Sequence, residues 1–254
     1  MKAVLSIVTI LAVLPLRGQI LDIRLDGTSS IPHEARSFAI TTLNQQLPEL
    51  VRMLKPKIIR VSQFGNDPWM SPGKDFAVPA LDALTCASPR IPAEIESIQS
   101  LKEAMIRRAE EACRESHARA RQRHEVALSN VVMAVQAAML AFPTRNYQCT
   151  AVGDLLALIA MAHEPTTFIV ITDAQETCGH LARQNITQPH PDVRVAFLIT
   201  PSVQDLTQRK SMAISFAEAK RTVHTVAPWV RMQPMSVGNI AGLLQEPTLA
   251  AQAK

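Results

Sequence analysis

The amino-acid sequence predicts an α/β fold: a doubly wound, mostly parallel sheet with helices on both faces. Segments with strand character alternate with helical segments along most of the chain, which is the pattern of strand-helix-strand units. Residues 166–172 form a continuous apolar run, and residues 193–199 form another. Runs of this kind are typical of strands buried on both faces, so we expect helices to cover the sheet from both sides.

The expected elements follow one another in that alternating order. A strand at residues 19–25 ends in a polar turn at residues 26–32, and an amphipathic helix at residues 34–54 continues through Pro48. The other expected elements are strands at 58–64, 75–81, 166–172, 193–199 and 229–232, and helices at 150–162, 204–226 and 237–244, followed by a short tail at 246–254.

Residues 91–142 depart from this alternation and are expected to be helical. A stripe with helical spacing is formed by Ile91, Ile95, Ile98, Leu101 and Met105. Residues 114–125 are nearly all polar, and residues 126–142 are apolar and rich in alanine. We interpret residues 91–125, approximately, as a helical insertion whose first part docks on the domain. The polar stretch is a solvated helix face or, as the alternative, a basic patch for an anionic partner.

The length of this segment raises a question of shape. A continuous helix over residues 92–142 would run about 75 Å, which is longer than the domain. Compact domains seldom carry helices of that length without coiled-coil heptads, so we expect a bend within residues 114–125. The alternative is a straight helix that protrudes and meets a second copy or a partner.

The composition is that of a globular protein. The 254 residues suffice for one large domain or two small ones, and 47% apolar with 19% charged residues excludes disorder of the whole chain. The formal net charge is +4, but acids are interleaved with the bases and aromatic residues make up only 4%. A nucleic-acid surface needs clustered bases and, for single strands, aromatic side chains, so we expect no nucleic-acid partner.

Residues 1–18 are predicted to be a signal peptide. Lys2 gives a positive start, residues 3–16 are apolar and uncharged, and Arg17-Gly18 follows. The run is too short to span about 30 Å of hydrocarbon, although a buried first strand or an uncleaved anchor is the alternative. We expect a secreted, periplasmic or cell-envelope protein, with its domain at residues 19–254 and no stable membrane span after signal cleavage.

The four cysteines are Cys86, Cys113, Cys149 and Cys178. No two of them form a Cys-x-x-Cys pair, which excludes zinc-ribbon and thioredoxin-type motifs. An even number in an exported chain is compatible with two disulfides, and four free buried thiols are the alternative.

Oxygen-bearing side chains are expected at one end of the sheet. The first strand ends in Asp26-x-Thr28-x-Ser30, Thr150 stands at a helix start, and the buried strand at residues 166–172 delivers Asp173. In an open parallel sheet, ligands bind in the loops at the carboxyl ends of the strands. Because Mg²⁺ accepts hydroxyls and water beside one or two carboxylates, this pattern predicts a site for a divalent cation.

These segments resemble the motifs of the von Willebrand factor type A (VWA) family. Asp26-Gly-Thr-Ser-Ser30 resembles its first metal-ion-dependent adhesion motif, usually Asp-x-Ser-x-Ser, and Thr150 resembles its lone threonine ahead of a helix. Residues 168–173 are similar to its apolar strand ending in Thr-Asp. The order and strand contexts agree over about residues 20–244, apart from the helical insertion. Cys149 and Ala174 depart from the family, which usually has glycine at both positions.

The resemblance implies a metal site and a binding function. Thr28 and Ser30 would hold Mg²⁺, or Mn²⁺ or Ca²⁺, through their hydroxyls, and Thr150 through its hydroxyl or a water. Asp26 and Asp173 would act through waters or hydrogen bonds. In this family a carboxylate of a protein partner usually fills the open coordination position, so the leading hypothesis is an exported binding module and not an enzyme.

If two site loops share one metal, two further expectations follow for the cysteines. Cys149 and Cys178 would then pair, and Cys86–Cys113 would be the second disulfide.

Two alternative functions are kept. One is a scaffold with a degenerate metal site, suggested by Ala174 and Cys149, that acts through its inserted helix. The other is a metal-assisted hydrolase in which Asp26 and Asp173 form a carboxylate pair, with His180 the one histidine placed to approach them. The chain contains no Gly-x-Ser-x-Gly, His-Glu-x-x-His or Walker motif, which disfavours the enzyme.

Overall fold

The computed structural model describes residues 20–69, 73–81, 85–86, 88–96, 98–142, 147, 149–179, 186–235 and 239–245. The predicted signal peptide at residues 1–18 and the predicted tail at residues 246–254 lie outside the described residues, and so does His180.

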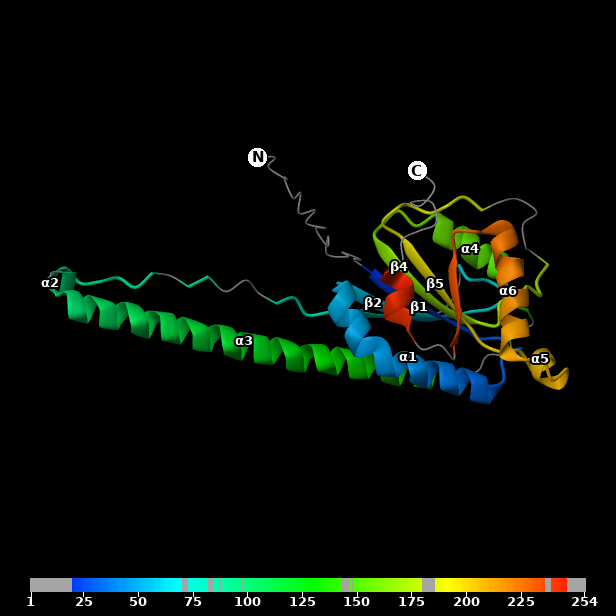
Figure 1. The fold of residues 1–254 in the computed structure, drawn as a ribbon, viewed down its shortest axis with the longest axis horizontal. Coiled ribbons are helices and arrows are strands. Elements are labelled where there is room, and N and C mark those ends of the chain that lie inside the picture. Colours follow the sequence, from blue (N-terminus) through cyan, green and yellow to red (C-terminus); the bar gives the residue numbers. More distant parts are fainter. Residues whose placement is uncertain are drawn as a thin grey trace, which may run out of the picture.

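A six-stranded sheet lies at the centre of the protein (Figure 1). Its strands are β1 (Ile20–Asp26), β2 (Ile58–Phe64), β3 (Gly73–Ala77), β4 (Thr166–Thr172), β5 (Arg194–Ile199) and β6 (Arg231–Pro234). The spatial order is β3-β2-β1-β4-β5-β6, and all neighbouring strands are parallel except β2 and β3. The predicted α/β fold with a mostly parallel sheet is therefore confirmed. The strand order reverses between β1 and β4, where open sheets of this kind bind their ligands.

Helices cover both faces of the sheet. They are α1 (His33–Leu54), α2 (Ala93–Glu96), α3 (Gln99–Ala141), α4 (Val152–Ala160), α5 (Val203–Thr207), α6 (Met212–Val226) and α7 (Ile240–Gln245). The helices α1, α3 and α7 contribute to one hydrophobic core, and α4 and α6 contribute to the other. Along β4, Ile169 and Ile171 enter the first core while Phe168 and Val170 enter the second. Since both faces of β4 are buried, its sequence is apolar without alternation.

Two expected elements differ from the structure for local reasons. The helix expected at residues 204–226 is divided into α5 and α6, because Arg209 adopts a left-handed conformation (φ 53°) and Ser211 begins α6 by accepting a hydrogen bond from the Ile214 amide. The strand expected at residues 75–81 begins and ends earlier, as β3. It pairs antiparallel with β2, and an exposed Arg60–Asp75 ion pair joins the two strands.

The helical insertion differs most from its prediction. Helix α3 is unbroken over 43 residues, about 65 Å, so the bend expected within residues 114–125 is wrong. The segment contains no glycine or proline and is rich in alanine, arginine and glutamate, which are strong helix formers. Its charged middle is therefore helical without support from a core.

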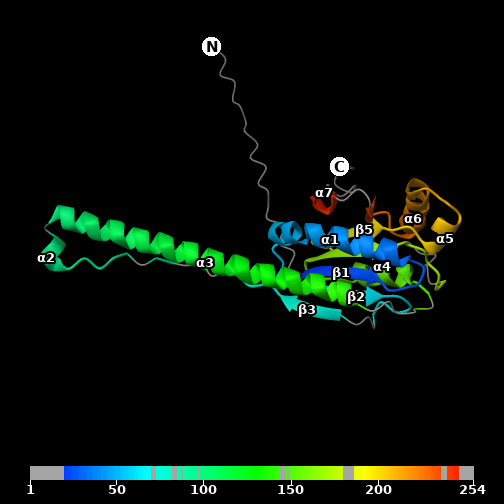
Figure 2. The same cartoon turned by 90° about the horizontal axis from the view of Figure 1, so that it is seen from below.

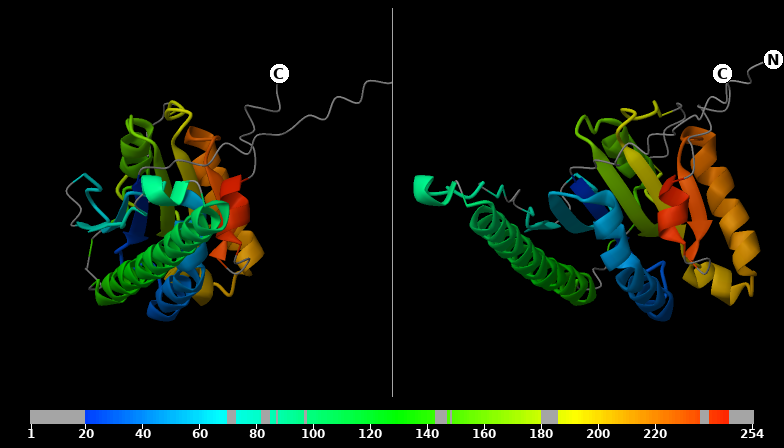
Figure 3. Two further views of the ribbon diagram at one scale, coloured as in Figure 1. Left: turned by 90° about the vertical axis from the view of Figure 1, so that its left-hand side faces the viewer. Right: turned by 60° about the vertical axis from the view of Figure 1, so that its left-hand side comes forward.

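The docking of α3 is also the reverse of the prediction. Its second half packs beside α1 through Leu128, Val132, Val135 and Met139, and its first half projects away from the sheet (Figures 1 and 2). The Gln136 side chain donates a hydrogen bond to the carbonyl of Asn44 in α1. Seen along its axis, α3 runs next to α1 on one side of the sheet (Figure 3).

From β3 the described part of the chain runs outward beside α3 to α2 at the far end of the projection, and we call the described residues within 78–98 the strap (Figure 2). A histidine nitrogen of α3, His124 Nε2, lies 3.1 Å from the carbonyl oxygen of Pro79, and a disulfide joins Cys86 to Cys113. The apolar stripe predicted to lie on one helix is divided: Ile91 lies on the strap, Ile95 in α2, and Leu101 in α3. The strap and residues 99–125 of α3 together form what we call the arm.

Among the described helices, α3 includes an 18-residue window long and apolar enough to cross a membrane by length and composition alone. Of that window 28% is buried inside the protein, and one such helix is weak evidence for a membrane span.

Candidate metal centre

The five residues predicted to form the metal site come together at the carboxyl ends of β1 and β4. Asp26 is the last residue of β1, and Thr28 and Ser30 follow it in the loop that leads to α1. Thr150 precedes α4, and Asp173 follows the last residue of β4. The site therefore lies at the point of the sheet where the strand order reverses.

Hydrogen bonds organise the β1 loop around the Asp26 carboxylate. The Thr28 hydroxyl and the Thr28 amide both donate to Asp26 Oδ1, at 2.7 and 3.0 Å. Asp26 Oδ2 accepts from the hydroxyl of Thr172, the last residue of β4, at 2.7 Å. Ser30 Oγ lies 2.7 Å from Thr28 Oγ1. The Asp26 carboxylate thus orients the Thr28 hydroxyl, and the Ser30 hydroxyl lies next to it.

Thr150 and Asp173 complete the group from the other two loops. The Thr150 hydroxyl donates to Thr28 Oγ1 at 3.1 Å, across 122 positions of sequence. Asp173 Oδ1 accepts from the Gln175 amide at 3.1 Å, and Ser30 also hydrogen-bonds to the Asp173 side chain. Three hydroxyls and two carboxylates from three separate loops therefore form one connected cluster.

The cluster is buried and rich in negative charge. The exposed fractions of Asp26 and Asp173 are 2% and 4%, and that of Thr150 is 0%. Burial, followed by the neighbouring Asp26, raises the pKa of Asp173 to about 7. Burial also raises the pKa of Asp26, although hydrogen bonds from Thr28 and Thr172 oppose the rise. Among the residues that the structure describes, none forms a hydrogen bond with Asp173 Oδ2. Because burial disfavours the charged form of both carboxylates, a cation bound between them would favour their ionised form.

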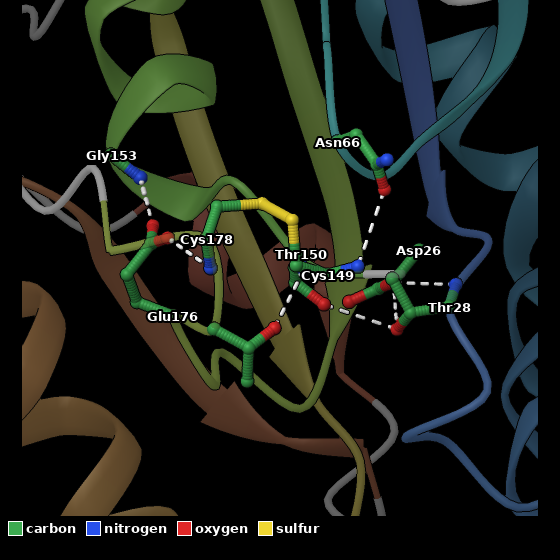
Figure 4. The surroundings of a disulfide bond; sticks show 9 residues. Asp26, Thr28, Asn66, Cys149, Thr150, Gly153, Glu176 and Cys178 are labelled. Atoms are coloured by element: carbon green, nitrogen blue, oxygen red, sulfur yellow. Dashed lines mark hydrogen bonds between the residues drawn. A yellow bond between two sulfur atoms is a disulfide. The ribbon is translucent and has the colours of Figure 1, made fainter. Parts of the chain in front are cut away.

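The Thr150 loop and the Asp173 loop are fastened to each other (Figure 4). The Thr150 amide donates to the Thr177 hydroxyl at 2.8 Å, and the Thr150 carbonyl accepts from the Thr177 amide. A carboxylate oxygen of Glu176 accepts from the Gly153 amide at the start of α4, at 2.8 Å. The predicted Cys149–Cys178 disulfide joins the same two loops and is confirmed, as is Cys86–Cys113. The alternative of four free thiols is therefore wrong.

Both departures from the family pattern fit into this arrangement. Ala174, where a glycine is usual, adopts the left-handed conformation (φ 55°) that glycine favours, and its methyl group is buried. Cys149 forms the disulfide. Neither residue displaces Thr150 or Asp173 from the cluster.

Sequence reasoning missed several residues that shape the site. The Arg36 guanidinium, from the first turn of α1, donates to the Thr28 carbonyl at 2.5 Å and places a positive charge near Asp26 and Asp173. Tyr147 packs so closely on Gly27 and Gly65 that a methyl group at either glycine would overlap its ring. Thr177 and Glu176 belong to no recognisable motif. The feature of the sequence that could have indicated their role is that they directly precede Cys178.

No family model matches the chain, and no curated protein matches it. Among solved structures, it is similar to the proximal thread matrix protein 1 of the mussel byssus, with a TM-score of 0.36 and 10% sequence identity over 90% of this chain. The match spans 46% of that protein, less than half its length. A likeness at this level does not identify a family, so the VWA resemblance stays a prediction.

The residues present suit a small, hard divalent cation. Such an ion prefers oxygen ligands and keeps several waters, and Mg²⁺ is commonly held by one or two carboxylates. Thr28, Ser30 and Thr150 could hold the ion through hydroxyls, and Asp173 Oδ2 is the buried acceptor left without a donor. Asp173 also lines a polar cleft of about 700 Å³ between its own loop and α5–α6, so the cluster is next to an open surface.

Proposed function

We propose that the protein is an exported binding module that holds one divalent cation, Mg²⁺ or Mn²⁺, at the carboxyl ends of β1 and β4. The ion would present its free coordination position to a carboxylate of a protein partner. The observation that carries the proposal is the contact of the Ser30 and Thr150 hydroxyls with the Thr28 hydroxyl, in a cluster that Ser30 also joins to Asp173.

Export is supported by the two disulfides, which persist in oxidising compartments outside the cytosol. The predicted signal peptide adds to this argument from the sequence. A secreted or envelope location is therefore part of the proposal.

The metal is tested by calorimetric titration of the mature protein with Mg²⁺ and Mn²⁺. We expect one ion to bind to the wild type and none to the double variant Thr28→Ala/Ser30→Ala, because that variant removes two of the three hydroxyl ligands. The matched control is Ser129→Ala/Thr225→Ala, which removes one serine and one threonine hydroxyl at exposed helical positions. Unchanged affinity in the first variant, with its circular dichroism intact, would refute the proposed ligand set.

The free coordination position needs a separate test. Mn²⁺ bound to the protein should broaden the proton resonance of added acetate, a minimal carboxylate, because acetate would enter the metal's open position. The Thr28→Ala/Ser30→Ala variant should not show this effect once unbound Mn²⁺ has been removed from both samples by gel filtration, because free Mn²⁺ broadens the acetate resonance by itself. Metal binding without any effect on acetate would leave a cation site but reject the carboxylate-bridging function.

A second candidate function, a scaffold, is supported by the arm. A helix that projects over much of its 43 residues offers a long polar surface that the domain does not use. The scaffold function gains support if the wild type binds neither Mg²⁺ nor Mn²⁺, because a degenerate site would then leave the arm as the working surface.

A further inference from the structure

The arm carries a second group of residues whose chemistry differs from that of the candidate metal centre. Cys86, Cys113 and His117 each offer one ligand atom, and the three atoms lie within 4.8 Å of one another. Within the described residues this is the one group of three such side chains that meets this distance criterion. Two sulfurs and an imidazole nitrogen are ligands typical of Zn²⁺, whereas Mg²⁺ prefers oxygen.

The backbone holds the three side chains in suitable places. Cys113 and His117 are four residues apart on α3, so they lie on the same face one turn apart. Cys86 reaches them from the strap, and its sulfur is 3.2 Å from His117 Nε2. Bonds of about 2.3 Å to sulfur and 2.0–2.1 Å to nitrogen place tetrahedral ligand atoms roughly 3.5–3.8 Å apart. A modest movement of these side chains would satisfy that spacing once the sulfurs are no longer bonded to each other.

The disulfide between Cys86 and Cys113 lies in the open. Cys86 is exposed, and Cys113 and His117 are partly exposed. The two cysteines also line a groove of about 660 Å³ between strap and helix, together with Glu110, which lies one turn before Cys113. A reductant therefore has access to the bond, and a metal at this place would have a fourth position facing the groove.

We propose that reduction of the Cys86–Cys113 disulfide opens a zinc site formed by Cys86, Cys113 and His117. A thiol reductant attacks Cys113 Sγ, the S–S bond breaks, and Cys86 leaves as a thiolate beside the His117 imidazole. A second reductant thiol releases Cys113, so that one disulfide of the reductant forms for the two cysteine thiols produced. Zn²⁺ then displaces the two thiol protons and binds both sulfurs and the neutral imidazole. The metal replaces the disulfide as the link between strap and α3.

The test uses the mature protein with Zn²⁺ alone, and with Co²⁺ as a spectroscopic substitute. After reduction with a phosphine, the wild type should bind one Zn²⁺, and Co²⁺ should give the near-ultraviolet absorption of a thiolate complex. The oxidised protein should give neither result. The double variant Cys149→Ser/Cys178→Ser keeps the proposed ligands and should bind as the wild type does, which excludes the other cysteines as the source.

The His117→Ala variant distinguishes a formed site from two free thiols. It keeps both cysteines and places a strong helix former in α3, so the fold should survive. We expect the Zn²⁺ affinity to fall at least about tenfold, since even loss of a group that only supports a ligand costs about 10–100-fold. The proposal is overturned if the reduced wild type gives no thiolate band, or if His117→Ala binds Zn²⁺ as tightly as the wild type. The Thr28→Ala/Ser30→Ala variant should bind Zn²⁺ normally, so this site and the proposed Mg²⁺ site can fail independently.

Discussion

The two disulfides join cysteines at nearly equal sequence separations, but in very different surroundings. Cys149–Cys178 spans 29 residues and joins two loops that are also held by hydrogen bonds from the backbone of Thr150 and Gly153. Cys86–Cys113 spans 27 residues and joins an exposed strap to the projecting half of α3. The first disulfide adds to a network that positions a buried charge cluster, and the second is one of the few links within the arm. One disulfide therefore helps to hold the loops of the candidate metal centre in place, whereas the other attaches the strap to α3.

The largest difference is expected for apolar side chains on the two halves of α3. Met139 is fully buried in the core that α3 shares with α1, and Leu101 in the arm is 47% exposed. Met139→Ala should lower the free energy of unfolding by about 2–5 kcal/mol, because it leaves a cavity. Leu101→Ala should change it by less than about 1 kcal/mol. Urea denaturation followed by circular dichroism measures both, and equal effects would mean that the arm is packed as tightly as the domain.

The disulfides offer the next test. The chain-entropy model assigns about 3–4 kcal/mol to a ring of either size. Cys149→Ser/Cys178→Ser should show a loss of this magnitude in the free energy of unfolding of the domain. Cys86→Ser/Cys113→Ser should show less than about 1 kcal/mol if the arm opens independently, since its ring then constrains neither state of the domain. Similar losses in both variants would show instead that arm and domain unfold as one cooperative unit.

The smallest effect is expected in the order of proteolytic cleavage within the arm. Four arginines, Arg114, Arg119, Arg121 and Arg123, are exposed but lie within an unbroken helix, whereas Arg90 is exposed in a part of the strap that is not helical. Trypsin binds its substrates in an extended conformation, so we expect cleavage after Arg90 before cleavage in α3. Mass spectrometry of a short digest gives the order. First cleavage among the four helical arginines would indicate that α3 opens or bends in solution.

Much of the sheet could be predicted from residue patterns, because several of its strands are runs of consecutive buried residues that stand out in the sequence as apolar. The run Thr166–Thr172 is buried at every position, and the predicted strand coincides with β4. The cluster of Asp26, Thr28 and Thr150 could be anticipated because strand ends in a parallel sheet converge, although the order of strands had to be assumed. Arg36 could not be anticipated, since nothing in its sequence context distinguishes it from an exposed arginine of a first helical turn.

The sequence by itself determined most of the strands and helices, and which polar side chains follow the buried strands. These features depend on the helix and strand propensities of neighbouring residues and on the spacing of apolar residues, and both can be read from the sequence. Only the tertiary structure decided which half of α3 docks, because each half carries apolar residues and the outcome depends on which set meets α1. It also decided that Ala174 takes a left-handed conformation and that Thr177 and Glu176 support Thr150. Those features arise from contacts between segments far apart in sequence, and no local pattern encodes them.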